Sequence, residues 1–296
     1  AIKGNLSNGL LQALDRKTKL EKRVETTNSE AYKYYLQGKF TWEMREDMTD
    51  VKIARDLLKK AILYDDNLFD AKRLLGISYF EMGNINKAMI IYKNNLRQAE
   101  KIGAKEAIGY SLHNIGTVHT QKSNFDKSLK YYNRALGIFN DICDKDGLSR
   151  IYTGFGIIYN RKCHYDKSIY YYNLALEIVE EIGAKRGIGT LLGNIAGIYG
   201  AQGDFNKCKD YAFRGLEIVK KAGDKRMIGF ILYGIGSYYY YYGEYEKAIK
   251  YLDDSIDIHN KIGNKFVELN NNVYKYLSYK YLGKTYDIKD IHILIK

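Results

Sequence analysis

The chain has 296 residues, of which 46% are hydrophobic, and it contains no proline. This composition excludes an intrinsically disordered chain and proline-rich linkers, and it favours long uninterrupted helices. The net charge of +12 favours acidic partners, although an AT-rich codon bias that enriches lysine would give the same balance.

The three cysteines, Cys143, Cys163 and Cys208, include no Cys-x-x-Cys pair, which fits free thiols in a reducing compartment. No signal peptide and no run of about 18 apolar residues is visible, so we expect a cytoplasmic protein that makes no membrane contact. The first residue is Ala1 rather than methionine, which suggests a processed product or a fragment of something longer.

Residues 1–29 are predicted to form a helical extension that is basic and only weakly amphipathic. A first pair of helices is predicted near 30–66, with Gly38 as the small residue of its first helix. Ala54 and Ala61 belong to its second helix. Apolar positions here are spaced by three and four residues, which is the helical period and not the period of two that strands show.

Five segments then repeat at a spacing of 40 residues without a gap: 74–88, 114–128, 154–168, 194–208 and 234–248. Each carries a small residue at Gly76, Gly116, Gly156, Ala196 or Gly236. An aromatic ring follows three residues later, at Tyr79, His119, Tyr159, Tyr199 and Tyr239. A second small residue comes at Ala88, Ser128, Ser168, Cys208 and Ala248. Small side chains let helices approach closely and rings fill the gaps, so these units are predicted to stack.

Each unit reads as two helices separated by a break. The first helix is predicted to end near Gly83, Gly203 or Gly243, because glycine accepts the positive φ of a helix C-cap. The second helix runs to another break, which contains glycine in four of the five units. One unit cannot bury its own apolar face, so the units must form an elongated solenoid.

This pattern of small and aromatic positions resembles the tetratricopeptide repeat, over roughly residues 30–286. The 40-residue period is similar to the longer variant found in G-protein-signalling modulators of the Leu-Gly-Asn type. The resemblance implies an all-α fold, a right-handed superhelix (α-solenoid) of about seven helix-turn-helix repeats that occupies 30–296. The units would lie near 30–66, 67–103, 107–143, 147–183, 187–223, 227–263 and 266–296, the last incomplete or capping.

The resemblance also implies a protein–protein interaction module that binds a peptide or partner protein in a concave groove lined by the first helix of each unit. The candidate groove residues are Arg73, His113, Asn114, Arg150, Asn160, Arg161, Asn194, Tyr233, Tyr240 and Tyr241. A further segment, "TTNSEAYKYYLQGKF" at 26–40, is similar to repeat regions attached to bacterial class III adenylate or guanylate cyclases. That similarity implies the regulatory or scaffolding region of a bacterial signalling protein, with any catalytic domain outside this chain.

Five consecutive tyrosines occupy 238–242, and on a helix they point in all directions. In the repeat register Tyr239 is the interior ring and Tyr238 packs between helices. Tyr240 and Tyr241 project into the groove, and Tyr242 closes the helix. Tyrosines used only as large amphipathic fillers are the alternative interpretation.

Asn114 and Asn194 occupy the position at which asparagine, in similar proteins, bonds the backbone of an extended peptide; a buried asparagine that satisfies its own helix is the alternative. Arg150 and Arg161 are candidates for holding a carboxylate through a bidentate fork, although an exposed arginine is often only solvated.

Two rows of lysines recur with the repeat and could follow a nucleic-acid backbone, which leaves a basic nucleic-acid-binding solenoid as an alternative function. They are Lys87, Lys127, Lys167, Lys207 and Lys247, and Lys105, Lys145, Lys185, Lys225 and Lys265. A solvated edge is the commoner role of such rows, and self-association through the terminal repeats is another open possibility. We expect no enzyme, cofactor or metal site, because no histidine has an acid or nucleophile partner in register and metal-ligand spacing is absent.

Overall fold

The computed structural model describes residues 28–45, 47–262 and 265–284. The predicted helical extension at 1–29 lies almost wholly outside these residues, as does the end of the unit predicted at 266–296. Helices are the only regular secondary structure in the described part of the chain, which confirms the all-α prediction.

The described helices form six consecutive pairs followed by α14. They are α2 (Ser29–Glu43) and α3 (Met48–Tyr64), α4 (Phe69–Glu81) and α5 (Ile85–Ile102), α6 (Lys105–Gln121) and α7 (Phe125–Asp141), α8 (Lys145–Arg161) and α9 (Tyr165–Glu181), α10 (Lys185–Ala201) and α11 (Phe205–Ala222), α12 (Lys225–Tyr241) and α13 (Tyr245–Ile262), and α14 (Lys265–Tyr281).

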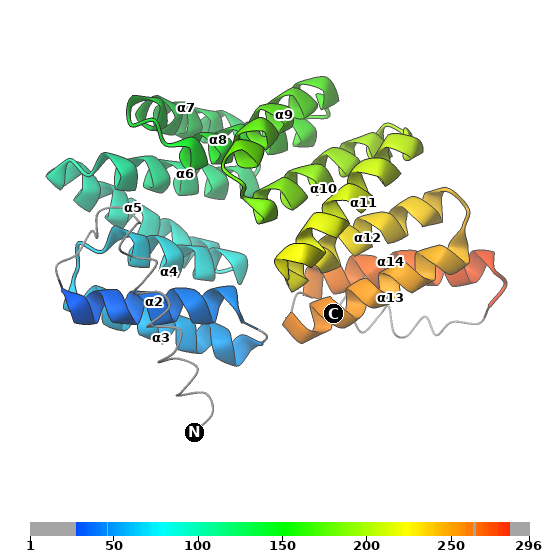
Figure 1. Ribbon diagram of the computed structural model, residues 1–296, viewed down its shortest axis with the longest axis horizontal. Coiled ribbons are helices and arrows are strands. Elements are labelled where there is room, and N and C mark those ends of the chain that lie inside the picture. The colour runs from blue at the N-terminus through cyan, green and yellow to red at the C-terminus, as the bar shows by residue number, and fades with distance from the viewer. Residues whose placement is uncertain (1–27, 46, 263–264, 285–296) are drawn as a thin grey trace.

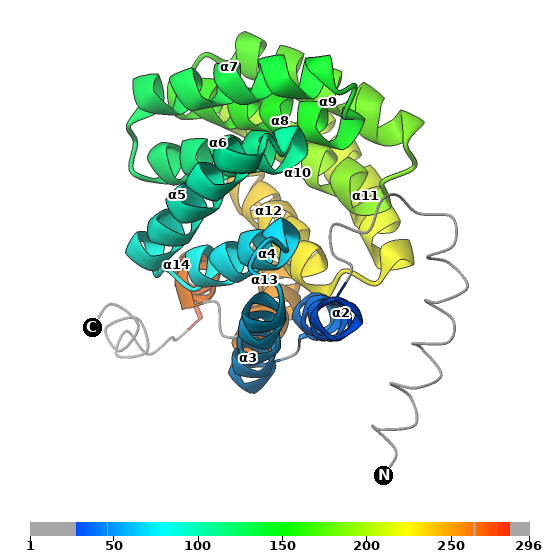
Figure 2. The same ribbon diagram turned by 90° about the vertical axis from the view of Figure 1, so that its left-hand side faces the viewer.

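The pairs follow one another around an arc, so that the first and the last pairs come to lie on opposite sides of its opening (Figure 1). The first helices of the middle pairs, α6, α8 and α10, lie on the inner side of this arc, and α7, α9 and α11 lie on the outer side (Figure 2). The arrangement is a superhelix of helix pairs, as the repeat pattern predicts.

Glycine ends several first helices through a left-handed backbone. Gly83, Gly203 and Gly243 have φ of 76°, 78° and 81°, a region that favours glycine because it lacks a Cβ atom. Ser123 and Cys163 take the equivalent place in two other units, with φ of 57° and 58°. The chain geometry of the break is therefore kept even where glycine is absent.

The first small residue of each unit is a notch for a side chain of the second helix. A Cβ atom on Gly156 would lie 2.4 Å from the ring of Tyr172, and one on Gly116 would lie 2.6 Å from the ring of Tyr132. In another unit the small residue is Ala196, which carries a methyl group. The residue that corresponds there to Tyr132 and Tyr172 is Ala212, which has no ring. The two helices therefore approach closely, as the sequence predicts, because a small side chain on the first helix faces a side chain of complementary size on the second.

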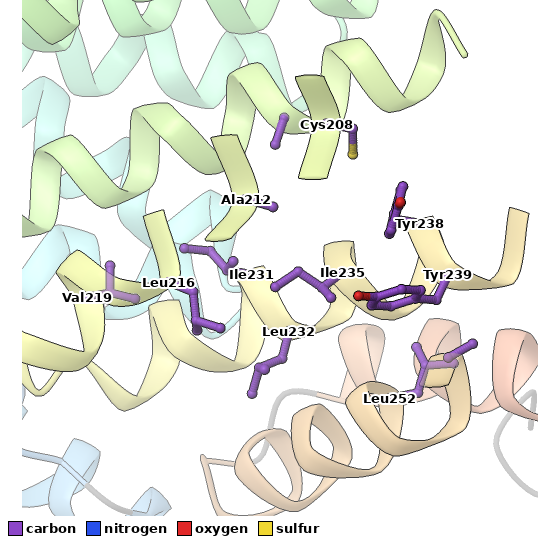
Figure 3. Close-up of a cluster of buried hydrophobic side chains, with 12 residues drawn as sticks. Cys208, Ala212, Leu216, Val219, Ile231, Leu232, Ile235, Tyr238, Tyr239 and Leu252 are labelled. Carbon is purple, nitrogen blue, oxygen red and sulfur yellow. The ribbon is translucent and has the colours of Figure 1, made fainter. Parts of the chain in front are cut away.

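Apolar side chains from successive units form continuous clusters. In the cluster drawn in Figure 3, Leu216 of α11 lies beside Ile231 of α12, and Leu252 of α13 approaches Tyr239 from the other side. Because each helix packs on both its own partner and the next unit, the units stabilise one another and hold the inner surface in place.

Candidate functional site

The inner face is the surface formed by the first helices of the units, α4, α6, α8, α10, α12 and α14, on the concave side of the arc. Side chains of this face link successive units directly. The Tyr110 hydroxyl of α6 donates to Asp146 of α8 at 3.0 Å, and Arg161 of α8 donates to the carbonyl oxygen of Thr120 in α6 at 2.9 Å.

A cluster of charged side chains lies on the part of the inner face that α4, α6 and α8 form. Arg73 pairs with Asp70 at 2.7 Å, and Arg150 pairs with Asp146 at the same distance. Both guanidinium groups lie over the ring of Tyr110, at 4.9 Å and 5.9 Å from its centre. Two of the three arginines in the candidate set are therefore already oriented by neighbouring carboxylates and by one shared ring.

His113 and Asn114 lie within this cluster of charged side chains. The Nδ1 atom of His113 is 3.2 Å from the Oδ1 atom of Asn114, and the ring stacks on Tyr132. The Asn114 side-chain nitrogen is buried and has no hydrogen-bond partner among the described residues. An unpartnered buried donor costs free energy, so a ligand carbonyl that reached this amide would gain a bond that the protein does not supply.

Burial, followed by the positive charge of Arg150, lowers the pKa of His113 to about 4. The free histidine titrates near 6.5, so between these values the unfolded chain binds a proton that the folded chain excludes. We expect the contribution of His113 to the free energy of unfolding to be complete above pH 6.5 and to be lost as the pH falls toward 4, by up to about 3 kcal/mol.

Urea denaturation at pH 7 and at pH 5 measures this loss, and His113→Gln should reduce the difference between the two values. The ring resonances of His113 report its pKa directly by NMR. A midpoint near 6.5 in the folded protein would contradict the lowered pKa of His113.

Arg161 and Asn160 lie at the C-terminal end of α8. Besides its bond to Thr120, Arg161 donates to the Oε1 atom of Gln121 at 3.2 Å, so its fork holds the end of α6. Asn160 is half-buried and forms no side-chain hydrogen bond with another described residue. The repeat pattern predicts an exposed Arg161 but does not indicate that its guanidinium group bonds the end of α6.

The α10 part of the inner face is a floor of small residues. A Cβ atom on Gly197 would meet nothing within 4 Å, and this residue is exposed. Asn194 is half-buried beside it, and its side chain forms no hydrogen bond with another described residue. This floor leaves room for a chain to approach the backbone of α10 closely.

Tyrosines cover the inner face of α12 and α14. The ring of Tyr274 lies 6.1 Å from Tyr233, 5.3 Å from Tyr240 and 5.8 Å from Tyr241. The hydroxyls of Tyr241 and Tyr274 are 3.0 Å apart, and Tyr241 remains 60% exposed. We call Tyr233, Tyr240, Tyr241, Tyr274 and Tyr281 the tyrosine wall.

Of the five consecutive tyrosines, Tyr238, Tyr239 and Tyr242 lie where the repeat register predicts them. Tyr238 and Tyr239 are buried, each with 7% of the residue exposed, whereas Tyr242 is the C-cap and is exposed. Tyr240 is half-buried and contacts Tyr245 and Tyr281. Tyr238 and Tyr239 therefore belong to the core, and Tyr240 and Tyr241 belong to the tyrosine wall.

The first lysine row contacts aromatic rings of its own units. Lys167 lies over Tyr159 at 5.5 Å, and Lys207 lies over Tyr199 at 5.0 Å. Where the ring is His119, burial and the charge of Lys127 lower the histidine pKa. These contacts give the row an intramolecular role.

Several inner-face residues are missing from the sequence-based set. Asp70 and Asp146 could have been found from their helical spacing to Arg73 and Arg150, and Tyr281 lies 40 residues after Tyr241. No spacing in the sequence indicates the role of Tyr110, because the arginines that contact its ring belong to the units on either side of its own.

No three His, Cys, Asp or Glu side chains within the described ranges lie close enough together to hold a metal ion. Among the helices described, none has the length and apolar character needed to cross a membrane.

The sequence matches the family model of the tetratricopeptide repeat at residues 67–141, 107–181 and 187–261. No curated protein matches it. Several solved structures are similar in fold. The crystal structure of NprR in complex with its cognate peptide NprX is 18% identical, with a TM-score of 0.65, and the match covers 98% of this chain and 87% of that one.

A Rap protein complexed with competence and sporulation factor is 16% identical, with a TM-score of 0.62, and the match covers 87% of this chain and 77% of that one. The signal-transduction ATPase PH0952 from Pyrococcus horikoshii, which has a tetratricopeptide repeat sensor, is 16% identical with a TM-score of 0.61. There the match covers 92% of this chain but only 46% of the ATPase. At these identities the likeness concerns the fold.

Proposed function

The chain belongs to the tetratricopeptide repeat family, and on that basis we propose that its inner face binds an extended peptide or a peptide segment of a partner protein. The observation that carries the proposal is a set of accessible positions on that face. Asn194 is half-buried and Gly197 is exposed on α10, and Tyr241 is exposed at the end of α12.

The chemistry of these positions suits a peptide. Side-chain amides pair with backbone carbonyl and amide groups, the glycine floor admits a backbone, and aromatic rings supply most of the binding free energy in such contacts. Asn114 and Asn194 would bond the ligand backbone, and Arg150 would attract a ligand carboxylate. An acidic ligand is favoured because the net charge of the protein is +12.

A similar fold, NprR, was solved in complex with its cognate peptide, and the Rap protein was solved in complex with competence and sporulation factor; the first of these supports a peptide ligand here. We further propose that the chain acts as the regulatory or scaffolding region of a bacterial signalling protein of the cyclase-associated kind, and that its role is recognition. Cys143 and Cys163 are exposed free thiols, which suits a reducing compartment such as the cytoplasm.

A random library of extended peptides, selected on the purified protein, tests this function. We expect selected peptides to bind the parent, and Asn194→Ala to weaken them by about fivefold, the value of one lost hydrogen bond of about 1 kcal/mol. Fluorescence anisotropy of a labelled selected peptide measures the affinity. A library that yields no binder, or binders indifferent to Asn194→Ala and to every other inner-face substitution, would contradict the proposal.

A further inference from the structure

A bridge of charged side chains joins two units that are far apart along the chain. Glu81 ends α4, and its Oε2 atom pairs with Arg45, from the turn between α2 and α3, at 2.6 Å. The same oxygen accepts a hydrogen bond from Arg226, in the first turn of α12. Glu81 and Arg226 are 145 residues apart, so this contact crosses the opening of the arc.

The bridge is not accompanied by extensive helix packing. Among the described helices, every pair in extensive contact is either adjacent in chain order or separated by a single helix. The pair α4 and α12 is not of this kind, and neither is the pair α2 and α12. The closure of the arc between the second and the sixth helix pairs therefore depends on side chains.

Arg45 is held firmly on its own side of the bridge. Its guanidinium carbon lies 3.5 Å from the ring centre of Trp42, and it also donates to the Trp42 carbonyl oxygen. On the other side, Arg186 of α10 pairs with Asp224, the N-cap of α12, at 2.6 Å. The cluster thus contains three arginines and two carboxylates, and the positive charges are in excess.

The arginines repel one another across the opening. Burial, and then the charges of Arg226 and Arg186, lower the pKa of Arg45 to about 10, although Glu81 acts in the opposite direction. Glu81 is the group that offsets this repulsion, because both Arg45 and Arg226 bond it. Without it the two edges of the opening would carry like charges.

We propose that the Arg45–Glu81–Arg226 bridge is a latch that closes the superhelix and, when released, opens the inner face to a ligand. The second clause rests on the peptide-binding function proposed above, whereas the first does not. The geometry favours reversibility, because the Glu81 and Arg226 side chains are 28% and 41% exposed and so remain partly hydrated. Between about 0.1 M and about 1 M salt the Debye length falls from about 10 Å to about 3 Å, which weakens such contacts.

The test compares the parent with Arg226→Gln, which removes only the far side of the latch, and with Arg226→Lys, which keeps its charge. Lys221→Gln is the matched control, since it removes the same charge from an exposed pair with Glu217 inside α11. Small-angle scattering gives the radius of gyration. Trp42 is the sole tryptophan of the sequence, so its fluorescence reports the surroundings of Arg45.

With no ligand present, we expect the radius of gyration of the parent to increase by about 5% between about 0.1 M and about 1 M NaCl. Arg226→Gln should already be expanded at the lower salt and should not respond further. Lys221→Gln should follow the parent, and Arg226→Lys should lie between the two. The Trp42 emission should shift in the same order.

A parent whose radius and Trp42 emission are unchanged by salt, or an Arg226→Gln protein that matches the parent at every salt concentration, would overturn the latch. Because neither measurement involves a peptide, that result would leave the peptide-binding proposal standing. A failure to bind selected peptides would leave the salt response intact and would remove only the role of the latch in ligand access.

Discussion

Gly156→Leu is expected to lower the free energy of unfolding by at least about 3 kcal/mol, at or above the upper end of the usual cost of overpacking. Even a Cβ atom at this position would lie 2.4 Å from Tyr172, whose side chain is almost wholly buried between α8 and α9. The ring has no free volume to enter, so the two helices must separate. Urea denaturation followed by circular dichroism measures the loss.

A pair of alanine substitutions controls for the helix propensity of glycine. Gly156→Ala should destabilise, because of the same clash. Gly234→Ala should be neutral or stabilising by up to about 1 kcal/mol, since a Cβ atom there meets nothing within 4 Å and alanine is the better helix former. If Gly156→Leu melts like the parent, then the contact between α8 and α9 is not the one described.

Tyr240→Ala combined with Tyr241→Ala is expected to weaken a selected peptide by roughly 30-fold or more while the protein stays folded. Truncation of one aromatic hot-spot residue at an interface costs about 2 kcal/mol or more, which is about 30-fold in affinity, so the stated loss requires one such residue among the two. Tyr241 is 60% exposed, so its removal exposes little core, and the buried rings of Tyr238 and Tyr239 are left in place. Fluorescence anisotropy gives the affinity, and thermal melting checks the fold.

Tyr170→Ala is the matched control, because this ring is 59% exposed on α9, a second helix of the outer side. It should leave peptide affinity unchanged. Equal losses in the two proteins would mean that the tyrosine wall has no special part in binding, and an unchanged affinity in the double variant would remove Tyr240 and Tyr241 from the site.

Much of the fold could be predicted because the relevant contacts lie within one repeat. Gly156 and Tyr172 are separated by 16 residues, and the same notch recurs at the 40-residue period, so sequence spacing alone indicates which helices approach closely. The positive φ at Gly203 likewise follows from the residue type. The replacement of the ring by His119 is accommodated locally, where it stacks on Tyr131 at 5.4 Å.

The partners of the candidate site residues were harder to predict. The repeat register indicates that Arg150 lies on a first helix, but whether its charge is free depends on Asp146 and on the ring of Tyr110 from another unit. The bridge from Glu81 to Arg226 depends on how much each unit is rotated relative to the last. That rotation accumulates over four units and leaves no periodic signal in the sequence.

Hydrogen exchange with and without a selected peptide tests the central claim most directly, because it reports on every helix at once. If the inner face is the binding site, bound peptide should slow exchange in α6, α8, α10 and α12 and should leave α7, α9 and α11 unchanged. Protection confined to the second helices of the units, or no protection in any first helix when the peptide is saturating, would contradict the account.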